Sequence, residues 1–290
     1  MTTSTGSSSP RSPERAATAT REGISAELER LGVRPKRSWG QSFLTDPFVA
    51  DAEAALVEVA PGTPVVEVGG GLGMLTEALL RRRITPLTVI ERDRQLAAHL
   101  RGRFRGEAKV READALTAEW GRPGALVGNL PFSVATLILV RAFDLRIPRV
   151  IALVQREVAE RLAAGPGSRV YGRLSILAAL HGSVELFQVV APTTFEPEPE
   201  VEGRILRFLR RSGELPVPSE GGFEEMLRRL FSGRRKQLAN LLPRVTPRGT
   251  SPEELARAAG WPKDWEHRRP ETLRPEDFFA LARSLHALST

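Results

Sequence analysis

The sequence predicts an α/β fold, a mostly parallel, doubly wound sheet with a small α-helical C-terminal domain. Between residues 64 and 154, short apolar runs alternate with stretches of helical length and pattern, which is typical of parallel strands joined by crossover helices. The first apolar run leads into a glycine-rich turn that opens a helix. After a Pro- and Gly-containing linker at 212–221, only helical patterns remain. We therefore expect a tail at 1–21, a sheet domain at 22–211 and a helical domain at 212–290.

Composition narrows the classes of function. The 290 residues include 42 Lys and Arg against 35 Asp and Glu, a net charge of +7, which suggests a polyanionic partner. The chain has no Cys, so disulfides, thiolate nucleophiles and Cys-ligated metals are excluded. Its four His are not spaced as metal ligands, and no apolar run has the length of a membrane span or signal sequence. We expect a soluble cytoplasmic protein without metal.

The N-terminal region is polar and basic. Residues 1–21 are rich in Ser, Thr and Ala and show no apolar periodicity. This composition predicts a disordered tail, with an organellar transit peptide as the alternative. A short amphipathic helix follows at 23–31. The basic cluster that includes Arg37, together with Trp39, either contacts RNA or forms a solvated loop with Trp39 on the core. Asp46 as N-cap, followed by Pro, then starts a helix at 46–59.

Three strand ends carry candidate binding residues. The strand 64–68 runs into Gly69–Gly73 and a helix to about residue 83; glycines there allow a ligand close to the backbone, and the helix N-terminus faces it. Met74 stands where a dinucleotide fingerprint requires its third glycine. Glu91 ends the strand 87–90 and is placed to accept two ribose hydroxyls, unless it is a surface acid. Asp114 follows a strand near 109–111 and either accepts an adenine amino group or caps a turn.

The next strand, at 125–127, ends in Gly128-Asn129-Leu130-Pro131-Phe132. Pro131 has no N–H and disfavours helix at Leu130, so the chain breaks into a loop. An Asn129 side-chain oxygen, a Leu130 carbonyl and the Phe132 ring provide two acceptors and a stacking surface. Methylation of an adenine amino group requires such a set; an ordinary turn is the alternative.

The rest of the chain continues the pattern before the helical domain. A helix at 223–231 is followed by Arg234-Arg235-Lys236, which we expect to form a basic helix that either holds phosphate or is a solvated face. The remaining expected elements are helices at 94–104, 133–144, 155–162 and 172–181, a strand at 150–154, a closing antiparallel pair at 184–190 and 204–209, and helices near 252–259 and 275–288.

In order and spacing, these motifs resemble the small-subunit ribosomal RNA adenine dimethylases (KsgA/Dim type), which are related to the Erm resistance methyltransferases. The resemblance covers about residues 35–245. It rests on Gly40–Leu44, Glu67–Gly73, Glu91–Asp93, Asp114–Leu116, Asn129–Phe132, Gln155–Leu162, Tyr171–Ser175, Phe195–Pro199 and Phe231–Lys236.

The resemblance implies a Rossmann-like fold that uses S-adenosylmethionine (SAM) and dimethylates adenosines in rRNA, two adjacent ones near the 3′ end of 16S-type rRNA in an assembling pre-30S particle, by a monomer. It also assigns residues. The residues that would face SAM are Gln41, Leu44, Gly69, Gly71, Gly73, Glu91, Asp114, Ala115 and Asn129. The residues that would hold the target base are Asn129, Leu130 and Phe132. The residues that would contact RNA are Arg37, Arg234, Arg235 and Lys236.

This sequence departs from the family pattern at three places. Gly70 replaces a usual Pro, which is expected to loosen the turn while keeping its N–H donors. Phe132 replaces the commoner Tyr, so stacking remains but a phenol contact is lost. Gly203 and Arg204 fall where a Ser usually follows the Pro-rich loop, which affects the expected target-loop contacts.

Three alternatives stay open at this point. An Erm-type methylase of 23S rRNA would share the SAM site and act on another RNA. A non-catalytic RNA-binding or assembly factor would keep the fold without the reaction. An NAD-dependent oxidoreductase is disfavoured by Met74 and by the lack of a candidate acid–base His near the turn.

Overall fold

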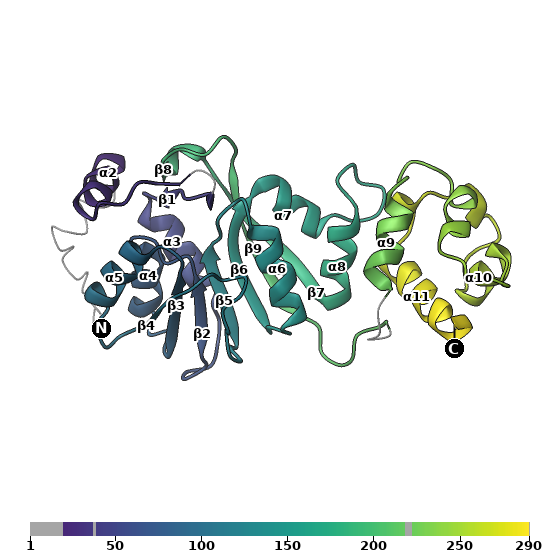
Figure 1. Ribbon diagram of the computed structural model, residues 1–290, viewed down its shortest axis with the longest axis horizontal. Helices are drawn as coiled ribbons and strands as arrows, with labels where there is room; N and C mark the ends of the chain where they lie inside the picture. Colours follow the sequence, from purple (N-terminus) through teal and green to yellow (C-terminus); the bar gives the residue numbers. More distant parts are fainter. Residues whose placement is uncertain (1–19, 37–38, 218–221, 290) are drawn as a thin grey trace, which may run out of the picture. The chain divides into compact units, whose positions relative to one another are not determined.

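The computed structural model describes residues 20–36, 39–217 and 222–289. A seven-stranded sheet has the strand order β4-β3-β2-β5-β6-β9-β7 (Figure 1). Its strands are β2 (Val65–Val68), β3 (Leu87–Glu91), β4 (Lys109–Glu112), β5 (Ala125–Asn129), β6 (Arg149–Gln155), β7 (Gly182–Val190) and β9 (Gly203–Arg210). β2 pairs in parallel with β3 and β5, and β3 pairs in parallel with β4. The predicted α/β class and mostly parallel sheet are therefore confirmed.

By their contacts, the residues fall into two compact units. Of the described residues, the first unit holds those up to 138 together with 151–154 and 189–205, and the second holds 139–150, 155–188 and those from 206 onward. We describe each by itself. The predicted boundary at residue 211 stays a prediction.

The first unit contains the strands that meet at the pocket. Its helices are α2 (Arg21–Arg30), α3 (Pro47–Ala55), α4 (Met74–Arg81) and α5 (Arg94–Arg103), and it holds the first residues of α6 (Ala135–Asp144). Val65, Val66 and Val68 of β2 are buried, as are Val89 and Ile90 of β3. Since strands buried on both faces read as continuous apolar runs, these are the runs that the sequence marks as strands.

The ends of two helices differ from the expectation. α2 begins at Arg21 because the Thr20 hydroxyl accepts the Gly23 N–H at 3.0 Å, so the predicted tail is shorter and the helix earlier. Residues 1–19 lie outside the described part. α3 starts as predicted, at Pro47 after the Asp46 cap, but ends at Ala55 rather than at 59. Pro61 and Gly62 follow in a turn, and they favour an early end to the helix.

A two-stranded sheet joins distant segments of the first unit and was not predicted. β1 (Phe43–Leu44) pairs antiparallel with β8 (Phe195–Glu196), with Phe43 opposite Glu196 and Leu44 opposite Phe195. Two-residue strands lack a periodic pattern that a sequence could display. This small sheet brings the Gly40–Leu44 motif beside the Pro-rich loop.

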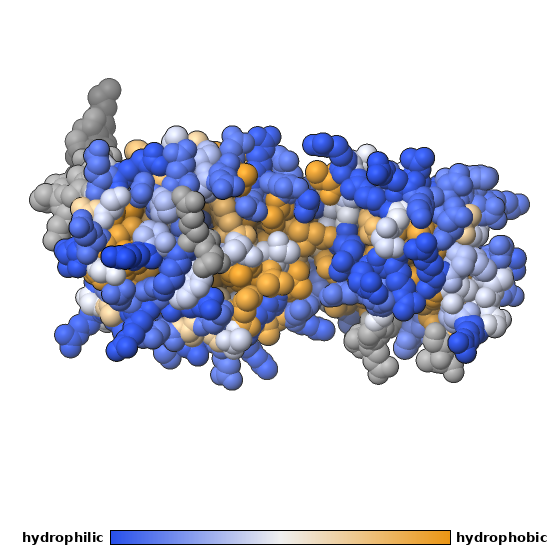
Figure 2. Space-filling model, turned by 45° about the horizontal axis from the view of Figure 1, so that its top comes forward, coloured by the Kyte–Doolittle hydropathy of each residue, from blue (hydrophilic) through white to orange (hydrophobic). Residues whose placement is uncertain are grey.

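The second unit has a helical core. Tyr171 and Ile176, at and within α8 (Arg173–His181), share one buried apolar cluster with Leu227 of α9 (Phe223–Phe231) and Phe278 of α11 (Pro275–Ser289). The Tyr171 hydroxyl donates to the Leu273 carbonyl at 2.9 Å. The other helices are α7 (Arg156–Ala163) and α10 (Pro252–Ala258), with short 3₁₀ turns at 238–240, 242–244, 265–267 and 270–272. Over α9–α11, most of the face shown in Figure 2 is hydrophilic.

Candidate active site

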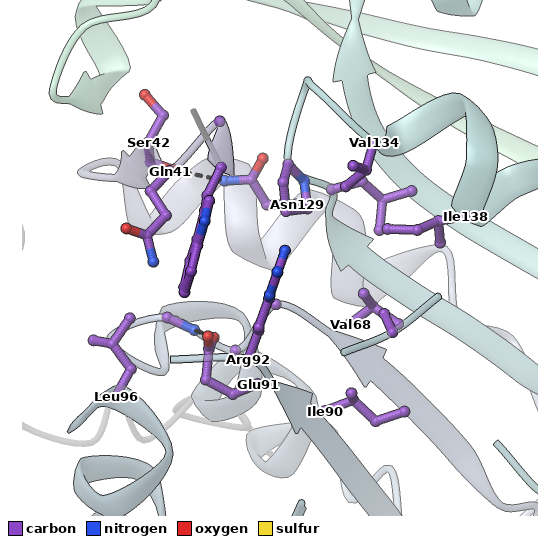
Figure 3. A pocket seen from close by; sticks show the side chains of 18 of the residues that line it. Gln41, Ser42, Val68, Ile90, Glu91, Arg92, Leu96, Asn129, Val134 and Ile138 are labelled. Carbon is purple, nitrogen blue, oxygen red and sulfur yellow. Dashed lines mark hydrogen bonds between the residues drawn. The ribbon is translucent and has the colours of Figure 1, made fainter. Parts of the chain in front are cut away.

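A pocket in the first unit collects most of the predicted site residues (Figure 3). It lies at the carboxyl ends of β2, β3 and β5, which meet at one sheet edge because these strands run in parallel. Its lining comes from Trp39–Leu44, Val68–Leu72, Met74, Leu75, Ile90–Arg92, Leu96, Ala113–Leu116, Asn129–Val134 and Ile138.

The glycine turn after β2 lines this pocket with Gly69–Leu72, whereas Gly73, which was predicted to face SAM, is not among the lining residues. Gly69, Gly71 and Gly73 have φ of +79°, +55° and +87°, a region that side chains disfavour. A Cβ on Gly71 would stand 3.2 Å from the Phe43 ring, and one on Gly73 would stand 2.5 Å from the Phe104 ring. Gly73 is also the N-cap of α4. The turn thus exposes backbone next to a helix N-terminus, which suits the polar end of an anionic ligand.

Gly70 is tightly enclosed by side chains from β3 and α5. A Cβ there would lie 2.5 Å from Val89 Cγ1 and 2.8 Å from Leu100 Cδ1. Both side chains are fully buried, so they already fill the space that a larger residue would need. That Gly70 loosens the turn relative to a proline stays a prediction.

Glu91 ends β3 with its carboxylate buried at 6% exposure. One oxygen accepts the Gly71 N–H at 2.9 Å and the other accepts the Asp93 N–H at 2.8 Å. Burial is the larger effect and raises the pKa of Glu91, although these two backbone hydrogen bonds oppose it. Since an ionised carboxylate has about four acceptor positions, both oxygens retain capacity for two hydroxyls in the pocket. The carboxylate also ties the glycine turn to β3.

We expect Glu91→Gln to weaken SAM binding by roughly 10- to 100-fold, because an amide has one acceptor atom and cannot accept at both ends. Isothermal calorimetry of SAM binding measures this. Glu112→Gln is the matched control: Glu112 stands opposite Glu91 in the β3–β4 register, but its side chain is exposed and pairs with Arg101 at 3.6 Å. Equal affinity of the two variants would remove Glu91 from the binding set.

The predicted adenine-reading residues form the next wall. Asp114 accepts the Leu116 N–H at 2.9 Å and lies 3.5 Å from the Arg92 guanidinium; Ala115 is buried. Arg92 also stands over the Trp39 ring at 4.4 Å, and Lys36 at 3.8 Å. Trp39 is half-buried at the pocket. Both interpretations of the basic cluster stay predictions, and Arg37 lies outside the described residues.

Gln41 and Leu44 reach the pocket from the N-terminal side. The Gln41 side-chain oxygen accepts the Lys36 N–H at 2.9 Å. The side-chain nitrogen is therefore the group that Gln41 can offer to a ligand, as a donor. Leu44 is buried within β1 and adds apolar lining.

The loop after β5 holds the predicted target-base residues. The Asn129 side-chain nitrogen donates to the Ser42 carbonyl at 3.4 Å, shown by the dashed line in Figure 3. Because a carbonyl oxygen only accepts, this contact fixes the amide with its nitrogen toward Ser42 and leaves Oδ1 as the acceptor. The Leu130 N–H donates to the Leu153 carbonyl at 3.0 Å. Phe132 meets the buried Phe195 edge-on, with centroids 6.4 Å apart.

The predicted RNA-binding residues near α9 belong to the second unit. The helix ends at Phe231, and Arg234–Lys236 form a turn closed by the Lys236 N–H to the Gly233 carbonyl; the expectation of a basic helix was wrong because the chain breaks at Ser232-Gly233. Arg234 pairs with Glu271 at 2.9 Å and donates to the Arg169 carbonyl. Arg235 and Lys236 are exposed.

Some site residues were missed. Ser42, Arg92 and the buried acid Glu67, which accepts the Thr76 hydroxyl at 2.7 Å beneath the glycine turn, stand inside motifs but were given no role. Ser42 directly follows Gln41, and Arg92 directly follows Glu91; this adjacency was the sequence signal that could have identified them. Within residues 20–36, 39–217 and 222–289, no group of three metal-ligating side chains gathers, and no helix of that part is long and apolar enough to cross a membrane.

Comparison with known proteins bears on this geometry. The model of a family described as ribosomal RNA adenine dimethylase matches residues 32–256. Ribosomal RNA small subunit methyltransferase A of Myxococcus xanthus is 36% identical over 270 residues, covering 90% of this chain and 95% of the relative. Its counterpart in Anaeromyxobacter dehalogenans is 38% identical, covering 90% and 96%.

Among solved structures, the 23S rRNA methyltransferase ErmE is 28% identical with a TM-score of 0.63, covering 84% of this chain and 99% of that one. The likeness therefore extends over the sheet and the pocket as well as over the sequence motifs. From these matches, the chain belongs to the ribosomal RNA adenine dimethylase family.

Proposed function

We propose that this protein transfers two methyl groups from SAM to the amino nitrogen of adenosines in small-subunit rRNA. The observation that carries the proposal is the Asn129 amide, which the Ser42 carbonyl orients so that an acceptor oxygen remains for the target N–H. Asn129 ends β5 beside the glycine turn, so the acceptor and the donor site share one pocket.

The residues of the pocket fit SAM. The glycine turn and the start of α4 suit its methionine part, and the Gln41 amide donor can reach a carboxylate there. Glu91 has acceptor capacity for the ribose hydroxyls, and Asp114 for the adenine amino group. When bound, SAM supplies an electrophilic methyl carbon.

The chain's own residues prepare the nucleophile. The lone pair of an adenine amino group is delocalised into the ring, so this nitrogen attacks poorly. Asn129 Oδ1 and the Leu130 carbonyl accept its two N–H bonds, hold the nitrogen in place and stabilise the positive charge that develops on it. The proton leaves to solvent after transfer, when the product nitrogen is acidic, and Phe132 stacks on the extruded base to offset part of its unstacking cost.

The relatives' names favour small-subunit rRNA over the Erm alternative, since both curated relatives described above are small-subunit methyltransferases. The finer assignments are part of the proposal: two adjacent adenosines near the 3′ end of 16S-type rRNA, a pre-30S particle as substrate, a monomer acting in the cytoplasm, and a helical domain at 212–290 that contacts RNA. Arg235 and Lys236 are exposed, and no ion pair found among the described residues joins either of them to a carboxylate. They therefore suit phosphate better than Arg234, which pairs with Glu271, does.

Methyl transfer to purified rRNA with labelled SAM, followed by mass identification of the nucleoside, tests the proposal. The expected product is N6,N6-dimethyladenosine. Binding of SAM without any methylated nucleoside, in free RNA or in ribosomal particles, would instead indicate the non-catalytic RNA-binding alternative.

A further inference from the structure

Ser42 contacts both the end of β5 and the loop after β8, and it belongs to none of the predicted binding sets. Its carbonyl accepts from the Asn129 amide, and its hydroxyl donates to the Pro197 carbonyl in a short hydrogen bond. Pro197 follows β8, whose Phe195 supports the Phe132 ring. One residue therefore contacts the acceptor amide and the loop behind the stacking ring.

Ser42 stands directly before β1, where the ladder between β1 and β8 ends. Phe43 pairs with Glu196 and Leu44 with Phe195, and the Thr45 N–H donates to the Thr194 carbonyl at 2.8 Å. The Ser42 carbonyl lies outside these pairs and accepts from the Asn129 side-chain nitrogen at 3.4 Å.

The Ser42 hydroxyl connects this end of β1 to the segment that follows β8. Pro197 has no N–H to donate, but its carbonyl accepts the Ser42 hydroxyl. Without that hydroxyl, this connection to the Pro-rich loop would be lost at the residue that contacts Asn129.

We propose that Ser42 is a positioning residue that aims Asn129 at the target nitrogen and matters most for the second methyl transfer. This rests on the proposed function. Unmethylated adenine offers two N–H bonds, so the Leu130 carbonyl and Asn129 both hold it. The monomethyl product has one N–H left, so alignment then depends on a single acceptor. A poorly positioned Asn129 acceptor therefore lowers the rate of the second transfer more than the rate of the first.

Selective labelling tests the positioning without any turnover. The chain has two asparagines, Asn129 and Asn240, so ¹⁵N-asparagine gives two side-chain amide pairs, and the exposed Asn240 is an internal reference. In Ser42→Ala, we expect the Asn129 pair to shift and its protons to exchange faster with water, while the Asn240 pair stays unchanged. An unchanged Asn129 pair would overturn the proposal.

Single-turnover methylation then tests the consequence. For Ser42→Ala, we expect the first transfer to slow about 10-fold and the second more, so that monomethyladenosine accumulates, with SAM affinity unchanged; Ser42→Thr, which keeps the hydroxyl, should restore dimethylation. Thr194→Val is the matched control, since it removes another hydroxyl bond of this segment, to the Ala191 carbonyl at 2.7 Å, away from Asn129.

The outcomes separate cleanly. A wild-type ratio of products in Ser42→Ala, or a matching loss of SAM affinity, would contradict a positioning role. If Ser42→Ala does not fold, Ser42→Cys replaces it, because a thiol has nearly the same size and is a weak donor. Absence of methylation by the wild-type protein would defeat the proposed function, and the labelling result would still stand for Ser42.

Discussion

Asn129→Ala is expected to lower the rate of methyl transfer by roughly 10³-fold while SAM affinity changes less than about 2-fold. The substitution removes the Oδ1 acceptor that Ser42 orients, so charge developing on the target nitrogen loses its fixed partner. Glu91 and the glycine turn, which we propose to hold SAM, are left unchanged, with the bond from the Gly71 N–H to Glu91 in place. Single-turnover kinetics with saturating SAM and calorimetry of SAM binding measure the two effects separately.

Two further variants sharpen this test. Asn240→Ala changes the other asparagine, which is exposed in a 3₁₀ turn of the second unit, and should leave rate and affinity unchanged. Asn129→Asp keeps an acceptor but sets a carboxylate against the Ser42 carbonyl, so it should be nearly as slow as alanine. A fall in SAM affinity as large as the fall in rate would place Asn129 in the donor site instead.

The second large effect is a loss of stability as the pH rises from about 4.5 to 8, caused by two buried acids in the first unit. Glu53 of α3 and Glu67 of β2 are both fully buried. Burial, together with the neighbouring Glu67 and against a hydrogen bond from the Leu153 backbone, raises the pKa of Glu53 to about 8. Burial likewise raises the pKa of Glu67, against the Thr76 hydrogen bond. Both carboxyls therefore keep their protons in the folded protein at neutral pH.

The direction of this change in the free energy of unfolding follows from the number of protons that the folded and unfolded states bind. Unfolded glutamates ionise near 4.5, so between pH 4.5 and 8 the folded state binds more protons and the free energy of unfolding falls as pH rises, by about 1.4 kcal/mol per pH unit for each carboxyl. His99 and His181, whose pKa values burial lowers, act oppositely, but only below about pH 6.5. Measurements between pH 6.5 and 8 isolate the acids.

Urea unfolding at several pH values tests this, with Glu53→Gln as the variant. An amide of the same size carries no proton to lose, so the variant should lose about half of the wild-type slope and be more stable than wild type at pH 8. Asp51→Asn is the control: it removes a carboxylate of the same helix that is exposed and paired with Arg81 at 2.5 Å. Parallel slopes for wild type and Glu53→Gln would show that Glu53 does not titrate as the buried geometry requires.

The sequence was sufficient where an apolar run ends in a functional residue. β2, β3 and β5 are largely buried, so each appears in the sequence as a short, mostly apolar run whose end can be located. The glycine turn, Glu91 and Asn129 were identified at those ends, and the family resemblance implied that they share one site. Their chemical roles remain proposals.

Other features depend on contacts that no local pattern displays. The β1–β8 pairing joins residues more than 150 positions apart in two-residue strands, and the role proposed for Ser42 depends on its contacts beside that pairing. Glu53 looks like a surface residue of an amphipathic helix, yet it is fully buried against Glu67. The fit of Gly70 depends on the sizes of Val89 and Leu100, which come from other elements.

The most direct test of the central claim is transfer of labelled methyl from SAM to undermodified 30S particles and, in parallel, to protein-free 23S rRNA. We expect N6,N6-dimethyladenosine in the 30S particles and none in 23S rRNA. Label in 23S rRNA alone would contradict the account and make the protein a large-subunit methylase of the Erm kind.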